Sequence, residues 1–561
     1  MREAVRALLT FRPGAWRHAV RSAPAYAAGW SLRRRVQAEL DELMQGPGRA
    51  LREAMAHDRP GPLVLFACFH DFRQQIKYDL AFAGALAVQG ANVAVLTRPD
   101  CSLVRRYWTA VGKADAVHAL TVGASAARPP LTDGAIDVRQ FLDLRYRGVS
   151  VGRWALATAF SRLRKSYSEL QEPGARAVVA AALDESYAAT DAAHEALDRI
   201  RPAAIVFVEK GYSPAGELFE AAVERQIDVV QYVHGHASNR LLVKRFGSHN
   251  RFQHPAEPSA ALWSDVQARP ADGERTGAVR RRIREAYASG EWFNRKYGQA
   301  GKRLRSRDEL TRELGLDPSR PTAVIFSHVG WDATFFYGRN LFADYDEWLT
   351  ETVRAAAEIP GVNWLVRVHP DNLWKAKASH RAEDRDRDRR LVERALGRVP
   401  ANVGWLGPSS DVRTDSLFDV ADICLTVRGT IGLEMACMGR HVVTAGTGRY
   451  SGYGFTLDSE TRDEYFARLR QVGSLPPPSP ERADLAARYV DTLIRERPIA
   501  MVTAVDRRPP PELVGTDPLG DDVDYRFSSV ADLRTAPDLA PVAHWILHSA
   551  DQDLVVTPCA G

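Results

Sequence analysis

The chain has 561 residues, enough for roughly two to four domains of ordinary size, so a single small module is excluded. Hydrophobic residues make up 45% and charged residues 26%, which is typical of a globular protein and not of a disordered one. The 75 Lys and Arg against 70 Asp and Glu give a net charge of only +5, too small an excess to indicate a nucleic-acid partner.

The five cysteines stand singly along the chain, without the spacing of a zinc site or of a redox motif. Isolated thiols are typical of a reducing compartment, so we expect a cytoplasmic protein. No apolar run approaches the ~18 residues of a membrane span.

Residues 1–50 are predicted to form a helical extension in which arginines alternate with apolar residues. Two interpretations are open. The segment is either a basic amphipathic helix in peripheral contact with the inner face of the cell membrane, or a helix packed on the next domain with its arginines in solvent. The second is favoured, because basic faces are usually solvated faces.

Residues 51–267 are predicted as a Rossmann-like domain. Short apolar runs at 63–69 and 91–96 flank a segment of helical spacing, which is the pattern of a βαβ unit in a parallel sheet. The same pattern recurs at 203–233, after a more helical insert at about 135–200.

A charged helical linker is expected at 268–320, followed by a second Rossmann-like domain at 321–480. Its predicted strands are 322–326, 364–368, 403–406, 423–427 and 441–444. A C-terminal helix over 481–500 and a Pro- and Asp-rich tail over 501–561 complete the chain. The pattern predicts an α/β protein whose two domains face each other across a cleft, where open α/β sheets bind ligands.

The most informative loop follows the predicted strand 423–427. It contains Arg428, Gly429 and Thr430, and a helix begins after it, so its backbone amides suit a phosphate. Gly432 and Glu434 lie in the first turn of that helix, from which a carboxylate could reach ribose hydroxyls. An ordinary helix cap with an exposed glutamate is the alternative interpretation.

Two further loops of the second domain follow strands. His369 and Pro370 end the strand 364–368, and the imidazole would bond a diphosphate leaving group. Arg367 lies two residues earlier, on the same face of the strand, and is predicted to join it. In the loop after the strand 322–326, Gly330 would let the backbone approach a ligand closely, although a simple turn explains it equally well.

The first domain offers three candidates for a general base that would take a proton from an acceptor hydroxyl. They are Glu209, His234 and the pair His70–Asp71, each placed after a predicted strand. The sequence does not choose among them.

Several of these residues occur together in a known family. His234-Gly235, Arg367-x-His369-Pro370 and Thr430-x-Gly432-Leu433-Glu434, with the glycine-rich loop 446–455, resemble capsular polysaccharide biosynthesis glycosyltransferases. These are GT-B enzymes that include Kdo transferases using a CMP-activated sugar. More distantly, the chain is similar to CDP-glycerol glycerophosphotransferases.

The resemblance implies that His369 contacts the donor phosphate, that His234 acts as base or acceptor contact, and that Glu434 binds the donor ribose. Where the family has small hydroxyl residues before the Gly-Leu-Glu element, this chain has Arg428 and Gly429. It also implies a donor that is a CMP- or UDP-linked sugar and no required metal. No Asp-x-Asp triplet follows a predicted strand.

The sequence therefore predicts a glycosyltransferase that moves a sugar from a nucleotide donor to a surface polysaccharide or lipid-linked acceptor. Two alternatives stay open. One is a nucleotide-sugar epimerase of the same two-domain plan, which would need no acceptor. The other is a non-catalytic scaffold of an envelope polysaccharide assembly complex, docked through its basic N-terminus.

Overall fold

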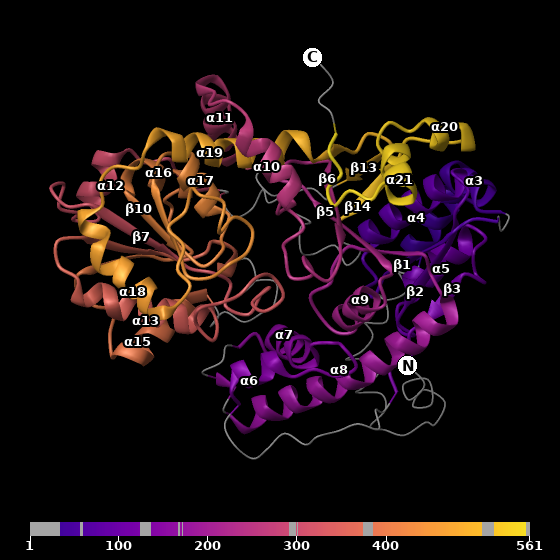
Figure 1. The fold of residues 1–561 in the computed structure, drawn as a ribbon, viewed down its shortest axis with the longest axis horizontal. Helices are drawn as coiled ribbons and strands as arrows, with labels where there is room; N and C mark the ends of the chain where they lie inside the picture. Colours follow the sequence, from indigo (N-terminus) through magenta and orange to yellow (C-terminus); the bar gives the residue numbers. More distant parts are fainter. Residues whose placement is uncertain are drawn as a thin grey trace, which may run out of the picture.

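The computed structural model describes residues 34–56, 60–123, 136–165, 169–170, 172–290, 299, 301–373, 385–507 and 521–556. Two parallel-rich sheets form two α/β domains, which stand side by side in Figure 1, the first in indigo to magenta and the second in orange. The expected α/β class with two Rossmann-like sheets is confirmed by this topology.

The first sheet has the strand order β12-β6-β5-β4-β1-β2-β3. Strands β1 to β5 run parallel, whereas β6 is antiparallel to both of its neighbours, β5 and β12. The chain moves outward from β1 in one direction and from β4 in the other, so the topological switch point lies between these strands. The strands are β1 (Leu63–Ala67), β2 (Asn92–Thr97), β3 (Val117–Ala119), β4 (Ala204–Phe207), β5 (Asp228–His234), β6 (Arg240–Phe246) and β12 (Ile499–Ala500).

Successive side chains of β1 enter two different hydrophobic cores. Val64 and Phe66 lie in the core shared with α4, whereas Leu65 and Ala67 lie in the core shared with α7 and α8. Side chains alternate across a strand, and both faces are covered here, so the strand reads as one continuous apolar run.

Helices cover both faces of the first sheet (Figure 1). The expected helical insert is present as α6, α7 and the long α8. The helices of this domain are α3 (Pro47–Ala54), α4 (Arg73–Val88), α5 (Ser102–Ala110), α6 (Val138–Asp143), α7 (Val151–Leu163), α8 (Pro173–Ile200) and α9 (Ala215–Glu224).

The second sheet is wholly parallel, in the order β11-β10-β7-β8-β9. Its switch point lies between β7 and β10. The strands are β7 (Thr322–Phe326), β8 (Asn363–Arg367), β9 (Val403–Leu406), β10 (Ile423–Thr426) and β11 (His441–Thr444). The helices are α13 (Tyr345–Glu358), α15 (Arg387–Leu396), α16 (Leu417–Val420), α17 (Ile431–Cys437) and α18 (Arg462–Gln471), with 3-10 turns η4 (Thr414–Ser416) and η5 (Val472–Ser474).

Helices also occupy the described part of the segment that leads from the first sheet to the second. It contains α10 (Ala260–Ala268), α11 (Gly273–Ser289) and α12 (Arg307–Glu313). α19 (Pro480–Asp491) packs against α11 and α17, and the π-helical turn η6 (Thr492–Glu496) then leads the chain back to β12 at the edge of the first sheet.

The C-terminal segment differs from the expected tail, because much of it is folded on the first domain. The hairpin β13 (Ala504–Arg507) and β14 (Asp522–Tyr525) and the helices α20 (Val530–Thr535) and α21 (Leu539–His548) pack against α4. Short apolar stretches lie among the Pro and Asp residues, and Leu539 and Ala543 in them are fully buried. Figure 1 shows this segment in yellow above the first domain.

At the other end, residues 34–45 are helical, and Val36, Leu40 and Leu43 are buried in the first core. This part of the N-terminal extension is therefore packed on the domain. Residues 1–33, which carry most of the predicted basic face, lie outside the described residues. Among the helices of the described ranges, none combines the length and apolar character needed to cross a bilayer.

Candidate functional site

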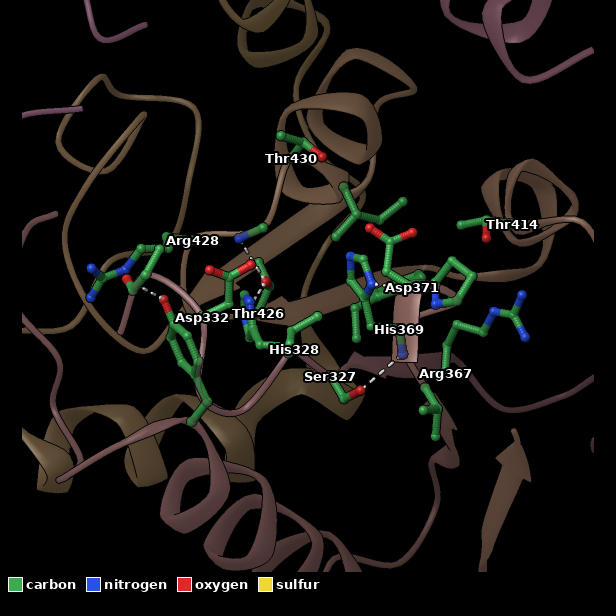
Figure 2. A pocket seen from close by; sticks show the side chains of 18 of the residues that line it. Ser327, His328, Asp332, Arg367, His369, Asp371, Thr414, Thr426, Arg428 and Thr430 are labelled. Carbon is green, nitrogen blue, oxygen red and sulfur yellow. Dashed lines mark hydrogen bonds between the residues drawn. The ribbon is translucent and has the colours of Figure 1, made fainter. Parts of the chain in front are cut away.

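A cavity of about 320 Å³ opens at the carboxyl ends of β7, β8 and β10 (Figure 2). It therefore lies at the switch point of the second sheet, where α/β proteins bind ligands. Its wall includes the loops after these strands, α11, Thr414 of η4, Arg449 in the loop after β11 and His254 in the loop that follows β6. We call it the second-sheet cavity.

His369 and Pro370, which the sequence predicts at a phosphate site, line this cavity. The backbone N–H of His369 donates to Ser327 Oγ at 3.0 Å, and the N–H of Asp371 donates to His369 Nδ1 at 3.2 Å. A ring nitrogen that accepts a hydrogen bond carries no proton, so the neutral imidazole holds its proton on Nε2. The loop thus presents His369 in one fixed tautomer.

His328 is a second imidazole in the cavity that the sequence analysis did not single out. The backbone N–H of Val427 donates to its Nε2 at 3.1 Å, so the proton of the neutral ring lies on Nδ1. Burial holds the pKa of His328 well below its usual range, and the nearby His369 and Arg428 lower it further. Its ring stacks on Tyr345, with 4.4 Å between centroids. The available signal was its place two residues beyond a buried strand, next to the switch point.

Arg428 lies in the cavity wall with only 6% of its surface exposed. Its Nη2 donates to Asn340 Oδ1, and the guanidinium lies 5.9 Å from the centre of the Tyr345 ring. Nε and Nη1 are buried and donate no hydrogen bond. Among the described residues, no carboxylate forms an ion pair with this side chain. A buried cation without a counter-ion is costly, so the cavity favours an anionic ligand.

Gly429 and Thr430 also line the cavity, and the Gly429 N–H donates to Thr426 Oγ1 at 3.1 Å. Thr430 makes no side-chain cap to α17. The N–H groups of Gly432 and Leu433 donate to the carbonyls of Gly429 and Thr430. The seven-residue α17 therefore offers fewer open amides than its sequence pattern indicates, and the positive charge at the cavity comes from arginine side chains, among them Arg428 and Arg449.

Arg367 also lines the cavity, but its guanidinium binds carbonyl groups of the protein. Its guanidinium is 1% exposed, and Nη1 and Nη2 donate to the carbonyls of Gly407 and Val412 at 3.1 and 3.0 Å. Burial lowers its pKa to about 10. In Figure 2 the side chain points away from His369, so it holds the loop beside the cavity in place.

Glu434 and Gly432 are buried in the structure and do not line the cavity. Glu434 accepts a hydrogen bond of 2.5 Å from Tyr287 Oη, a contact that differs from the expected ribose contact. A Cβ at Gly432 would lie 2.1 Å from Tyr450 Oη, which shows that this glycine is required for packing.

Gly330 also allows a close approach, but to protein atoms. A Cβ there would lie 2.5 Å from Asp346 Oδ1 and 2.7 Å from Arg387 Nη1. These two side chains form an ion pair, and Gly330 does not line the second-sheet cavity. The glycine makes room for the pair.

The loop between β7 and α13, residues 327–344, connects the two domains. Phe335 and Phe336 lie in the core of the first domain, where the rings of Phe160 and Phe335 meet edge to face at 4.8 Å. A Cβ at Gly211 would lie 2.2 Å from the Phe336 ring. The Phe336 ring therefore packs directly against the backbone of the first domain, at a position where only glycine leaves room. The contact fixes one domain against the other beside the cavity.

Glu209 lies at this junction, directly after β4. Its Oε1 accepts hydrogen bonds from the N–H groups of Lys210 and Gly211 at 2.9 and 3.0 Å. Burial raises its pKa to about 7, and the charge of Asp332 in the second-sheet cavity adds to the shift. A carboxyl group that titrates near neutral pH is suited to general acid and base chemistry.

The other two base candidates lie elsewhere. His234 lines a second cavity, of about 300 Å³, at the carboxyl ends of β1, β4 and β5. We call it the first-sheet cavity. The Asp71 carboxylate accepts the N–H groups of Ser102 and Leu103 at 2.9 Å and so caps α5, and His70 stacks on Phe72.

Two doubly wound domains with cavities at the carboxyl ends of their sheets form the two-domain plan of the GT-B fold. Among the residues that the structure describes, no group of three or more His, Cys, Asp or Glu side chains could hold a metal. The four cysteines at 68, 101, 424 and 437 are buried and free, and Cys559 lies outside the described ranges.

No protein-family model matches the chain, and no curated protein matches it. Among solved structures, the chain is similar to the KpsC β-Kdo 2,4 transferase of Thermosulfurimonas dismutans, with 15% identity and a TM-score of 0.32 over 59% of this chain and 87% of that one. It is also similar to UDP-GlcNAc 2-epimerase of Neisseria meningitidis, with 10% identity and a TM-score of 0.26 over 76% and 95%. A glycosyltransferase of Rickettsia africae is similar as well, with 9% identity and a TM-score of 0.28 over 78% of this chain and 94% of that one.

At these identities and TM-scores, the similarities carry no argument about activity. They include both transferases and epimerases, so the chemistry of this chain has to be argued from its own side chains.

Proposed function

We propose that this protein is a glycosyltransferase that moves a sugar from a CMP- or UDP-linked donor to a surface polysaccharide or lipid-linked acceptor. The observation that carries the proposal is Arg428, a buried guanidinium without a carboxylate partner among the described residues, in a cavity that also holds His328 and His369. In this hypothesis the donor binds in the second-sheet cavity and the acceptor approaches from the first domain.

The three side chains suit an anionic phosphate. Arg428 supplies a fixed positive charge, and charge-assisted hydrogen bonds are about twice as strong as neutral ones. His328 and His369, in the tautomers that their backbone contacts select, would donate from Nδ1 and Nε2. When the bond between sugar and phosphate breaks, negative charge develops on the phosphate oxygen, and these donors would stabilise it without a metal.

The acceptor hydroxyl has to lose its proton as it attacks the sugar. Glu209 directly follows β4 and His234 ends β5, and either of these first-domain groups could take the proton. The enzyme would work at the cytoplasmic face of the membrane, where a nucleotide donor is available, and would need no nucleic acid.

A nucleotide-sugar epimerase is the competing function. It would use the second-sheet cavity alone, whereas the first-sheet cavity gives the chain a second place for a ligand. Incubation of the protein with labelled nucleotide sugars and no acceptor separates the two, because inversion of the sugar under these conditions would replace the transferase proposal.

The proposal is tested by thermal unfolding with CMP, CDP, UDP, GDP and their sugars, using the wild type, Arg428→Met and Arg339→Met. We expect one nucleotide series, cytidine or uridine, to stabilise the wild type by about 2.7 kcal/mol at a hundredfold excess over its Kd. Arg428→Met should lose this stabilisation. Arg339, which is exposed and paired with Glu460, is the matched control and should keep it.

Absence of a nucleotide effect on the wild type, together with normal polysaccharide output from cells carrying His369→Ala, would favour the scaffold alternative over a transferase.

A further inference from the structure

The first-sheet cavity lies at the switch point of the first sheet. It is lined by the residues that follow β1, by Val208 after β4 and by the end of β5. The next residue after Val208 is Glu209, whose carboxyl group is close enough to Asp332 in the second-sheet cavity for the two to interact. The two cavities therefore flank the same strand end.

A carboxylate from the C-terminal segment lies beside His234, which lines this cavity. Asp506 lies in β13, and its side chain is only 2% exposed. Its Oδ1 accepts hydrogen bonds from Tyr78 Oη at 2.6 Å and from Gln74 Nε2 at 2.8 Å, and its own N–H donates to Asn239 Oδ1 at 2.7 Å. Three contacts from two parts of the first domain thus fix the position of this carboxylate.

The second oxygen of Asp506 faces His234. Oδ2 is buried without a hydrogen bond, and it lies 3.8 Å from His234 Nδ1. A carboxylate beside Nδ1 favours the tautomer with the proton there, which leaves the lone pair on Nε2. The imidazole is 35% exposed, so its outer edge is open to the cavity while the carboxylate lies beneath it.

An exposed aromatic ring in the first-sheet cavity indicates which class of ligand it could bind. Phe72 lines the same cavity, stacks on His70 with 5.1 Å between centroids, and is 64% exposed, which is unusual for a large apolar side chain. An exposed ring beside polar groups provides a platform for the C–H face of a pyranose, whose hydroxyl groups remain free for hydrogen bonds.

We propose that the first-sheet cavity binds a carbohydrate acceptor and that His234 takes the proton of its hydroxyl, with Asp506 as the positioning residue that orients the imidazole. The inference rests on the proposed transferase function. The acceptor O–H bond breaks and its proton moves to Nε2, while the oxygen bonds to the anomeric carbon of the donor sugar. The bond from that carbon to the phosphate oxygen breaks, and its electron pair leaves with the phosphate.

Among the residues that the structure describes, other titratable and charged groups contact His234 or line the same cavity. They include Tyr78 and Arg73 of α4, Tyr232 of β5, Asp506 of β13 and Asp521 before β14. Arg73 is paired with Glu39 and Asp522, so its charge is partly balanced. Asp506 is the group that we expect to control the imidazole.

The test measures the rate at which diethyl pyrocarbonate modifies His234 as a function of pH, by peptide mass spectrometry of the full chain. The reagent attacks the unprotonated imidazole, and a nearby carboxylate favours the protonated form. We expect Asp506→Asn to lower the midpoint pH of the reaction by about one unit. We call His234 and Asp506 the dyad. An unchanged midpoint in Asp506→Asn would overturn the proposed role of Asp506 in this dyad.

Two variants control for general disturbance. Tyr78→Phe keeps the carboxylate and removes one of its donors, so the midpoint should stay at or above the wild-type value; a fall equal to that of Asp506→Asn would overturn the dyad. Asp524→Asn removes an exposed carboxylate from the other strand of the hairpin and should leave the midpoint unchanged.

A further measurement needs no variant. Methyl β-D-galactopyranoside and methyl α-D-glucopyranoside, at high millimolar concentration, should slow the modification of His234 in the wild type and not in Phe72→Ala. Equal rates with and without these glycosides would overturn the carbohydrate site.

The outcomes separate this inference from the proposed function. A midpoint shift in Asp506→Asn without any nucleotide effect would leave the dyad standing and remove the transferase. Once transfer is measured, Asp506→Asn should lower kcat by about a hundredfold with the KM for the donor unchanged. Full transfer activity in Asp506→Asn would overturn the inference and leave the transferase standing.

Discussion

The hydroxyl of Tyr450 donates a hydrogen bond of 2.6 Å to the carbonyl oxygen of Gly429, and so fixes the turn that carries Arg428. Tyr450 is fully buried, and its ring passes directly over Gly432, where no side chain intervenes. The position of the guanidinium in the second-sheet cavity therefore depends on a contact between two loops of the second domain.

Gly432→Ala should disturb this contact. The new Cβ would lie 2.1 Å from Tyr450 Oη, a distance that forces the ring or the helix to move. Overpacking of this kind costs about 1–3 kcal/mol. We expect a lower melting temperature and weaker nucleotide binding in thermal unfolding. Gly432→Ala combined with Tyr450→Phe, which removes the clashing oxygen, should recover part of the stability; no recovery would show that another contact is responsible.

Glu209 predicts a pH dependence of stability. Because its pKa is raised to about 7 in the folded protein, from about 4.5 in the unfolded chain, the folded state binds the proton more tightly. Its contribution is therefore present below about pH 4.5 and is lost as the pH rises to about 7, with little change above that. Glu209→Gln keeps the acceptor for the two N–H groups and removes the titration.

The measurement is the difference in unfolding free energy between Glu209→Gln and the wild type, at pH values from 4.5 to 8. As the pH rises to about 7, the variant should become more stable relative to the wild type by at most about 3 kcal/mol. Above that pH the difference should stay constant. Taking the difference between the two proteins removes the contributions of other raised carboxyl groups, such as Asp79 and Glu217. A difference independent of pH would contradict the raised pKa of Glu209.

A substitution at Glu434 can show whether this carboxylate stabilises the fold through Tyr287 or binds the ribose of the donor. Glu434→Gln keeps a side chain of the same shape beside Tyr287. It replaces the charged carboxylate that accepts the hydrogen bond of the Tyr287 hydroxyl with a neutral amide. We expect a loss of stability of about 1–3 kcal/mol, with nucleotide affinity changed by less than about threefold. Calorimetric titration of the nucleotide that stabilises the wild type checks this. A loss of affinity of tenfold or more would restore the ribose role implied by the family resemblance.

The C-terminal segment should be necessary for stability. Leu539 in α21 is fully buried in the first core, whereas Val555 is 45% exposed. Leu539→Ala should destabilise the protein by about 2–5 kcal/mol, and Val555→Ala should change it by less than about 0.5 kcal/mol. Chemical unfolding of the two variants compares them directly. Equal stability would mean that the segment contributes little to the fold.

The sequence by itself determined the α/β class, the two parallel-rich sheets and the loops that bear His369 and Arg428. Buried parallel strands are continuous apolar runs, and a residue just after such a run has to lie at the carboxyl edge of its sheet. Both signals are local, so they can be identified without knowing how the chain folds.

The tertiary structure alone decided which groups each of these side chains contacts. Arg367 and His369 lie on the same face of one strand by spacing, yet the carbonyls of Gly407 and Val412 hold the first away from the second. His328 and Asp506 became candidates only through partners about a hundred or more residues away in sequence, Val427 and His234. Long-range contacts, burial and the tautomer of an imidazole depend on groups brought together by folding, and no local pattern contains them.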